Sequence, residues 1–212
     1  LVRWTKPRIQ MKVAIILVSL ALLYPVMRIA GIFPTNVLYD VSASINQDRA
    51  SSLKFRFDQE DQLLQHASER FLFGWGRFGR NRIYVETWEG LAGDASVTDG
   101  LWIITLGQFG LVGFIAQFGL LAASIFAAAR SLPAVQSFPH AVLLAGLALL
   151  ITANIIELLP NSTLTPWSWM LVGTLLGASE ASAARARKQP KAATTSNIAI
   201  NSQRLRGSEA LR

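Results

Sequence analysis

Residues 101–129, LWIITLGQFGLVGFIAQFGLLAASIFAAA, contain no charged side chain, and this run decides the fold class. A membrane-spanning helix needs about 17–25 mostly apolar residues. Three more apolar runs follow the same pattern: residues 13–33, 141–159 and the shorter 164–179. Only 16% of the chain is charged, whereas soluble domains average roughly 25%. The sequence therefore predicts an all-α membrane protein with four transmembrane helices.

The basic residues set the expected topology, because cytoplasmic segments next to spans are enriched in Lys and Arg. The segment 1–12 carries four basic residues and no acid, and the loop 130–140 carries Arg130 and no acid. The segment 34–100 instead holds seven basic and ten acidic residues. We therefore expect both termini in the cytoplasm, and the large loop 34–100 and the short loop 160–163 outside.

Several classes of site are excluded or disfavoured by composition. The chain has no cysteine, which excludes disulfides, thiolate metal sites and cysteine nucleophiles. Its two histidines, His66 and His140, are expected on opposite sides of the membrane, so no metal cofactor is predicted. The net charge of +7 reflects topology, and no nucleic-acid-binding motif is present. The segment 180–212 is poor in large apolar residues and is predicted to be a disordered basic cytoplasmic tail. Its basic residues either serve as a topology anchor with no specific partner or contact the anionic head groups of membrane lipids.

The outer loop is too long and too aromatic to be a simple connection. Its Ser52–Arg70 segment has an apolar stripe at three- and four-residue steps, which predicts an amphipathic helix at the membrane surface. The stretch FLFGWGRFGRNR, Phe71–Arg82, then predicts a glycine-rich turn whose aromatic side chains lie at the lipid interface. A brief extended piece is expected at Ile83–Thr87.

The loop is also rich in arginine, whose planar guanidinium holds phosphate oxygens in a two-pronged fork. Glycine-rich backbone permits close approach to the same anion. The alternative is that these arginines pair with the ten acidic residues of the loop. The candidate phosphate-binding residues are Arg49, Arg56, Arg77, Arg80 and Arg82.

Two residues are candidate proton acceptors. Histidine is the common proton acceptor at neutral pH, and His66 has Glu69 three residues later to orient it. Asp99 stands directly before the 101–129 span. The structural alternatives are a surface histidine on the loop helix and, for Asp99, an N-cap of the span.

Arg28 and Glu157 are the charged residues within the predicted spans. Charges inside the bilayer are costly and mark function or a buried pair. The two lie at similar positions along parallel spans, both roughly 23 Å from the inner edge at about 1.5 Å per residue. We expect them to form a structural ion pair near the outer face.

The order of these features resembles the O-antigen ligase and polymerase superfamily of bacterial inner-membrane proteins. The resemblance covers about Arg49 to Phe126: the R-x6-R pair Arg49 and Arg56, the helix with LLQHA, the FGWG turn and the LWIITLGQFGLVGF span. Where this family has a histidine just before that span, the chain has Asp99. Because full members have around a dozen spans and this chain begins at Leu1, we expect it to be the C-terminal part of a longer protein.

The resemblance implies a metal-independent glycosyltransferase in the bacterial inner membrane, acting at the periplasmic face. Its donor would be a glycan on undecaprenyl pyrophosphate, held by the loop arginines. Its acceptor would be a sugar hydroxyl on another glycan or on lipid A–core, deprotonated by Asp99 or His66. The alternative function is a non-catalytic membrane subunit of surface polysaccharide assembly or export.

Overall fold

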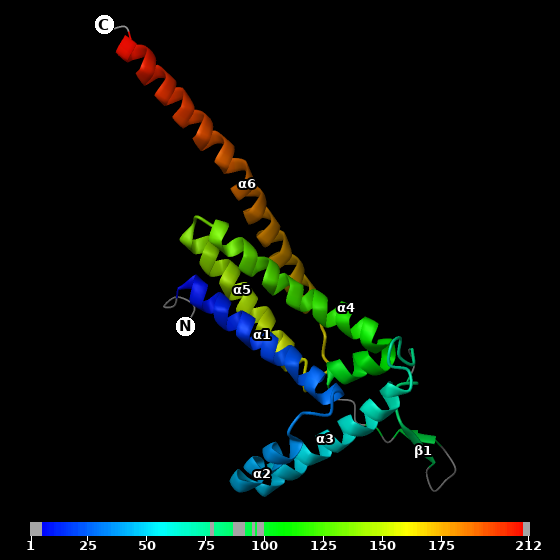
Figure 1. Ribbon diagram of the computed structural model, residues 1–212. Coiled ribbons are helices and arrows are strands. Elements are labelled where there is room, and N and C mark those ends of the chain that lie inside the picture. Colours follow the sequence, from blue (N-terminus) through cyan, green and yellow to red (C-terminus); the bar gives the residue numbers. More distant parts are fainter. Residues whose placement is uncertain (1–5, 77–78, 87–91, 95, 97–99, 210–212) are drawn as a thin grey trace.

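The computed structural model describes residues 6–76, 79–86, 92–94, 96 and 100–209, although the side chains of 86, 92 and 188–209 are not described. Its core is a bundle of helices (Figure 1). The elements are α1 (Pro7–Ile29), α2 (Thr35–Ile45), α3 (Gln47–Ser68), β1 (Tyr84–Glu86), β2 (Ala92–Asp94), α4 (Leu101–Ser131), η1 (Leu132–Ala134), α5 (Phe138–Glu157) and α6 (Pro166–Glu209).

Three segments in the described part of the chain are long and apolar enough to cross a membrane: α1, α5 and Leu101–Ala134, which joins α4 and η1. This agrees with an all-α membrane protein. The fourth predicted span, 164–179, forms the start of α6 and is not among the three. It stays a prediction, since its short uncharged run leads directly to the polar and basic part of α6.

Small residues let the bundle helices approach closely. Ala14 and Val18 of α1 are fully buried, as are Ala145 and Ala148 of α5. The Thr152 hydroxyl donates a hydrogen bond to the Ala148 carbonyl of its own helix at 2.8 Å. The apolar faces of α1, α4 and α5 thus form one core, and α6 runs beside α4 before it projects from the bundle (Figure 1).

The structure continues α6 through the segment predicted to be a disordered tail, as far as Glu209. The reason lies in composition: Ala, Arg, Lys and Gln, which are frequent there, are all good helix formers. Low apolar content predicts that a segment lacks a packed core, but it does not prevent a single helix.

The predicted outer loop folds into α2, α3 and a short antiparallel pair, β1 and β2. The loop helix is confirmed, and it begins earlier than Ser52 because the Asn46 side chain caps it by accepting a hydrogen bond from the Arg49 N–H at 3.1 Å. The helix α2, which the sequence did not predict, lies antiparallel to α3 (Figure 1). The extended piece is confirmed in part by β1.

A break in α4 receives the glycine-rich turn. Gly110 has non-helical backbone angles, φ 66° and ψ −166°, in the middle of the helix. Four hydrogen bonds join the two backbones there: Trp75 N–H to Gly107 O (2.8 Å), Gly76 N–H to Gln108 O (2.9 Å), Leu111 N–H to Phe71 O (2.8 Å) and Val112 N–H to Leu72 O (3.2 Å).

Close approach of two backbones explains the glycines at this junction. A Cβ atom on Gly110 would lie 2.3 Å from the Leu72 backbone, and one on Gly74 would lie 2.5 Å from the Gln108 backbone. Both glycines have a positive φ, a backbone conformation that residues other than glycine rarely adopt. Gly110 of α4 and Gly74 of the turn therefore permit the outer turn to dock against the helix.

Candidate functional site

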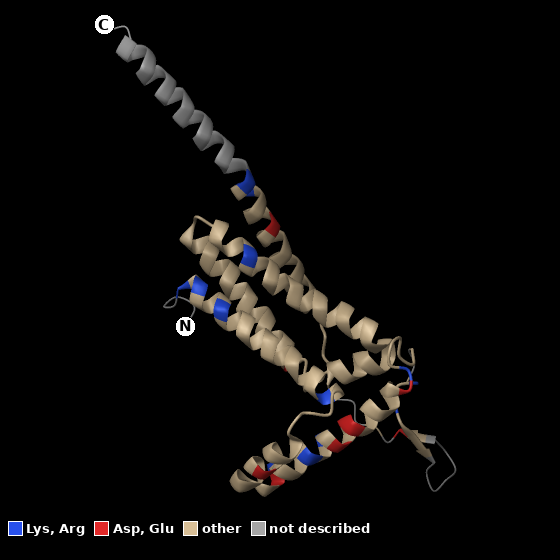
Figure 2. Ribbon diagram, viewed as in Figure 1, with Lys and Arg blue, Asp and Glu red and all other residues tan. Residues whose placement is uncertain are grey.

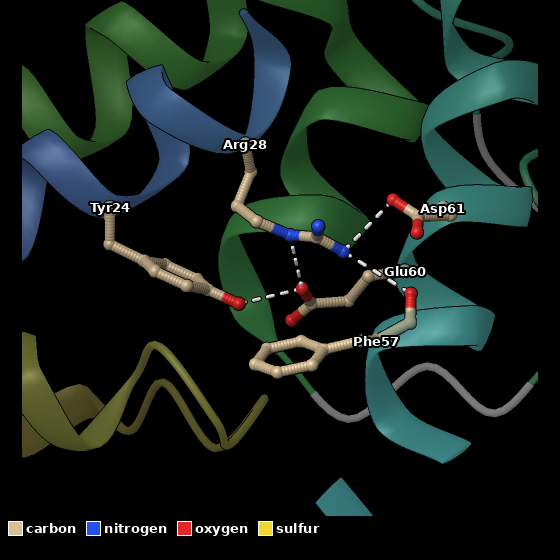
Figure 3. Close-up of polar contacts among 5 residues, drawn as sticks. All are labelled: Tyr24, Arg28, Phe57, Glu60 and Asp61. Atoms are coloured by element: carbon tan, nitrogen blue, oxygen red, sulfur yellow. Dashed lines mark hydrogen bonds and ion pairs between the residues drawn. The ribbon is translucent and has the colours of Figure 1, made fainter. Parts of the chain in front are cut away.

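A buried arginine joins the end of α1 to α3 (Figure 3). The Arg28 side chain is 5% exposed, and its Nε lies 3.0 Å from an oxygen of Glu60. One terminal nitrogen lies 3.0 Å from Asp61 and donates to the Phe57 carbonyl at 3.2 Å. Tyr24, one helical turn before Arg28, donates its hydroxyl to Glu60 at 2.6 Å. Among the described residues, the acceptors in these contacts of the guanidinium, Glu60, Asp61 and the Phe57 carbonyl, all belong to α3.

The predicted ion pair between Arg28 and Glu157 is therefore wrong. No such pair occurs among the described residues, and Glu157 is exposed on α5. The prediction matched Arg28 to the acid at the same depth within the spans. In the structure, α3 crosses the end of α1 and places two adjacent carboxylates closer (Figure 3).

A cavity of about 310 Å³ lies beside this cluster. The rings of Tyr24, Phe33 and Phe57 line it, and the start of α4 and Pro160 close another side. Its polar lining is confined mainly to one part of α3, where Arg56, Gln59 and Glu60 lie. Such a cavity fits a ligand that is largely apolar and carries a polar group at one place.

A second, more open hollow of about 400 Å³ adjoins the first along α3. It is lined by Asp48, Arg49, Ser52, Leu53 and Arg56, and Leu53 and Arg56 line both hollows. Residues seven apart lie on the same helix face two turns apart. The R-x6-R spacing therefore places both arginines on one face of α3, along one shallow, open groove that shares Leu53 and Arg56 with the apolar cavity.

The predicted proton acceptor His66 lies at the other end of α3. Its ring stacks on Trp75 with centroids 4.4 Å apart. Its Nε2 lies 3.0 Å from the Arg80 carbonyl oxygen. Because a carbonyl oxygen only accepts hydrogen bonds, Nε2 must carry the hydrogen, and in the neutral ring the free lone pair is then on Nδ1. Nδ1 lies 3.9 Å from Glu69, as the i, i+3 spacing predicted. His66 is thus held by the glycine-rich turn, ten residues from Arg56, or about 15 Å along the helix.

The three arginines of the turn, Arg77, Arg80 and Arg82, differ in their surroundings and in whether the structure describes them. Arg82 forms an ion pair with Asp94 of β2. Hydrogen bonds from Ser96, and then from Arg82, hold the pKa of Asp94 below its ordinary value. Arg80 contacts His66 through its carbonyl while its side chain is exposed, and Arg77 lies outside the described residues.

Asp99 also lies outside the described residues. The N-cap of α4 is Gly100, and the N–H of Leu101 donates to the carbonyls of Leu158 and Asn161 at 3.1 and 3.2 Å. The N-cap alternative for Asp99 stays a prediction, because this side chain is outside the described residues.

Sequence reasoning missed the partners of Arg28 and the aromatic walls of the cavity. One signal was available: Tyr24 and Arg28 are four residues apart, and so share a helix face, near the outer end of a span. No group of His, Asp and Glu side chains among the described residues is arranged to hold a metal ion. Comparisons with protein families, with curated proteins and with solved structures find no match for this chain.

Proposed function

We propose that this chain binds the donor of an O-antigen ligase- or polymerase-like glycosyltransferase, a glycan on undecaprenyl pyrophosphate. The observation that carries the proposal is the pair of adjoining hollows on α3. One is largely apolar, the other has Arg49 and Arg56, and Leu53 and Arg56 line both. The isoprene units nearest the pyrophosphate would occupy the apolar cavity, and the pyrophosphate would lie along the arginine groove.

The charges of the groove favour this assignment. Guanidinium groups form paired, charge-assisted hydrogen bonds with phosphate oxygens. Asp48 shares the groove and would oppose an anion, but it also lies in the first turn of α3, where the helix dipole stabilises a carboxylate. The proposal includes an orientation with α2, α3 and the hairpin at the periplasmic face. Lys6, Arg8 and Lys12 at the opposite end of α1 support it (Figure 2).

The transfer itself follows from the resemblance. The acceptor hydroxyl oxygen attacks C1 of the donor sugar, the new C1–O bond forms, and the C1–O bond to pyrophosphate breaks. Arg49 and Arg56 stabilise the charge of the departing pyrophosphate. Asp99 or His66 takes the proton of the hydroxyl. A base must lie within hydrogen-bond reach of that proton, so His66 requires a donor sugar that extends along α3 toward the glycine-rich turn.

One observation favours the second candidate, a non-catalytic subunit of polysaccharide assembly or export. His66 is engaged by the Trp75 ring and the Arg80 carbonyl, which is a structural use of the side chain. In that case the two hollows bind the lipid-linked glycan without any transfer.

Binding of undecaprenyl pyrophosphate to the purified protein, followed by native mass spectrometry, tests the donor site. We expect Arg49→Gln and Arg56→Gln each to weaken binding about tenfold, as for loss of one charge-assisted contact. Arg82→Gln is the matched control, because it removes the same charge from the loop but at the hairpin. Wild-type binding by both groove variants would disprove the donor site.

Transfer is tested in cells by surface polysaccharide at equal protein level. Loss of polymer in Asp99→Asn or in His66→Phe, with donor binding retained, supports the enzyme. Normal polymer in both of these variants, together with loss in the groove variants, supports the non-catalytic subunit.

A further inference from the structure

A separate crevice of about 480 Å³ lies at the opposite end of the bundle, between η1, the start of α5 and the middle of α6. Leu143, Leu144 and Leu147 of α5 and Ala178 of α6 form its apolar part. His140 of α5 and Arg185 of α6 form its polar part. These residues belong neither to the proposed donor site nor to the cluster of polar residues around Arg28.

The polarity of the crevice changes in one direction along both helices. The two helices run antiparallel in the bundle (Figure 1), so His140 to Leu147 and Arg185 to Ala178 lead the same way. Each interval is seven residues, or about 10 Å of helix. The charged end therefore lies at the level of the loop between η1 and α5, and the apolar end lies deeper among the helices. This gradient matches a lipid, with its headgroup at the surface and its chain inside.

The charge at this end selects the headgroup. Arg130 of α4 and the basic residues of α1 also lie at this end (Figure 2). Among the described residues that line the crevice there is no carboxylate. A zwitterionic headgroup would place its ammonium without an acidic partner there, whereas an anionic headgroup meets Arg185 and the ring of His140.

We propose that the crevice binds one anionic phospholipid of the leaflet at the basic end of the bundle. The phosphate contacts Arg185 and His140, and one acyl chain lies between α5 and α6 along Leu143, Leu147 and Ala178. The Ser182 hydroxyl donates to the Ala178 carbonyl at 2.8 Å, so it offers the lipid an acceptor rather than its proton. Basic pockets between transmembrane helices are known to take such headgroups. This site goes beyond the proposed transferase function and does not rest on it.

Native mass spectrometry of the purified protein with added phosphatidylglycerol or phosphatidylcholine tests the proposal. We expect one phosphatidylglycerol to bind at least about tenfold more tightly than phosphatidylcholine, and Arg185→Gln to remove about tenfold of that affinity. Arg187→Gln is the matched control. It is on the same helix, has the same charge change and is exposed like Arg185, but it does not line the crevice.

Three results would overturn the site: equal affinity for the two lipids, equal loss in Arg185→Gln and Arg187→Gln, or no loss in either. The last two would mean diffuse attraction to a basic surface, or binding elsewhere. Competition by glycerol 3-phosphate distinguishes a lipid from a free phosphate. Displacement of the lipid by micromolar glycerol 3-phosphate would show that the acyl chain adds nothing.

Discussion

Arg28 lies 3.0 Å from Glu60, although the two residues belong to a predicted span and to the loop that follows it. The side chain of Glu60 is 17% exposed and also accepts the hydroxyl hydrogen of Tyr24 at 2.6 Å. This pair fixes α3 against the end of α1, and α3 carries the walls of both hollows. The buried ion pair therefore helps to set the position of the proposed donor site, together with the contacts of Arg28 with Asp61 and of α3 with α4.

Removal of Arg28 is expected to destabilise the protein strongly, because a buried charge that loses its partner costs about 3–5 kcal/mol of unfolding free energy. We expect Arg28→Ala, which leaves Glu60 without its ion-pair partner, to lower the thermal unfolding temperature in detergent, read by tryptophan fluorescence. Glu60→Gln should lower it less, because Arg28 keeps Asp61 at 3.0 Å. Asp58→Asn is the control for Glu60→Gln, because it removes the same charge from an exposed position of α3. Equal melting of all three variants and the wild type would contradict a structural role for the pair.

How much the sequence predicts is clear from this pair. The apolar runs predict α1, α4 and α5, and the stripe within 52–70 predicts most of α3, because periodicity and hydropathy are local. The partner of Arg28 is 32 residues away in sequence, and depth within a span could not show that α3 crosses the end of α1. The candidate site was likewise predicted only in part. The R-x6-R spacing places Arg49 and Arg56 along one groove, while the apolar cavity beside it needs the tertiary fold.

The contact of His66 with Trp75 predicts a graded loss of stability. His66→Phe retains an aromatic ring for stacking but loses the hydrogen bond to Arg80, which contributes about 1 kcal/mol. His66→Ala loses both that bond and the stacking, so its loss should be larger by a further 0.5 to about 1.5 kcal/mol. Thermal unfolding of the two variants measures the difference. If His66→Ala unfolds at the wild-type temperature, the stack does not support the turn.

The hairpin contact of Asp94 predicts a dependence on acid pH. Its pKa is lowered in the folded protein by Ser96 and Arg82, so its contribution is complete above the ordinary aspartate value of about 3.9. The contribution is lost as the pH falls below that value and through the lower folded pKa. We expect proteolysis of the β1–β2 segment by pepsin to increase steeply below about pH 4. Asp94→Asn should be cleaved readily at all these pH values, whereas an unchanged pH profile in this variant would show that another group controls the hairpin.

The docking of the turn into α4 predicts opposite effects for two glycines of one helix. Gly110→Ala places a Cβ atom 2.3 Å from the Leu72 backbone at a positive φ, so the turn or the helix must move and the four backbone hydrogen bonds weaken. We expect a loss of several kcal/mol, since backbone strain and lost buried hydrogen bonds each cost about 1–3 kcal/mol. Gly119→Ala meets its nearest atom, in Ile115, at 4.0 Å, and alanine favours helix by about 1 kcal/mol. The thermal unfolding temperature should therefore fall for Gly110→Ala and remain equal or rise for Gly119→Ala. A similar fall in both variants would mean that α4 tolerates no added methyl group, and that the break at Gly110 has no special part in holding the outer turn.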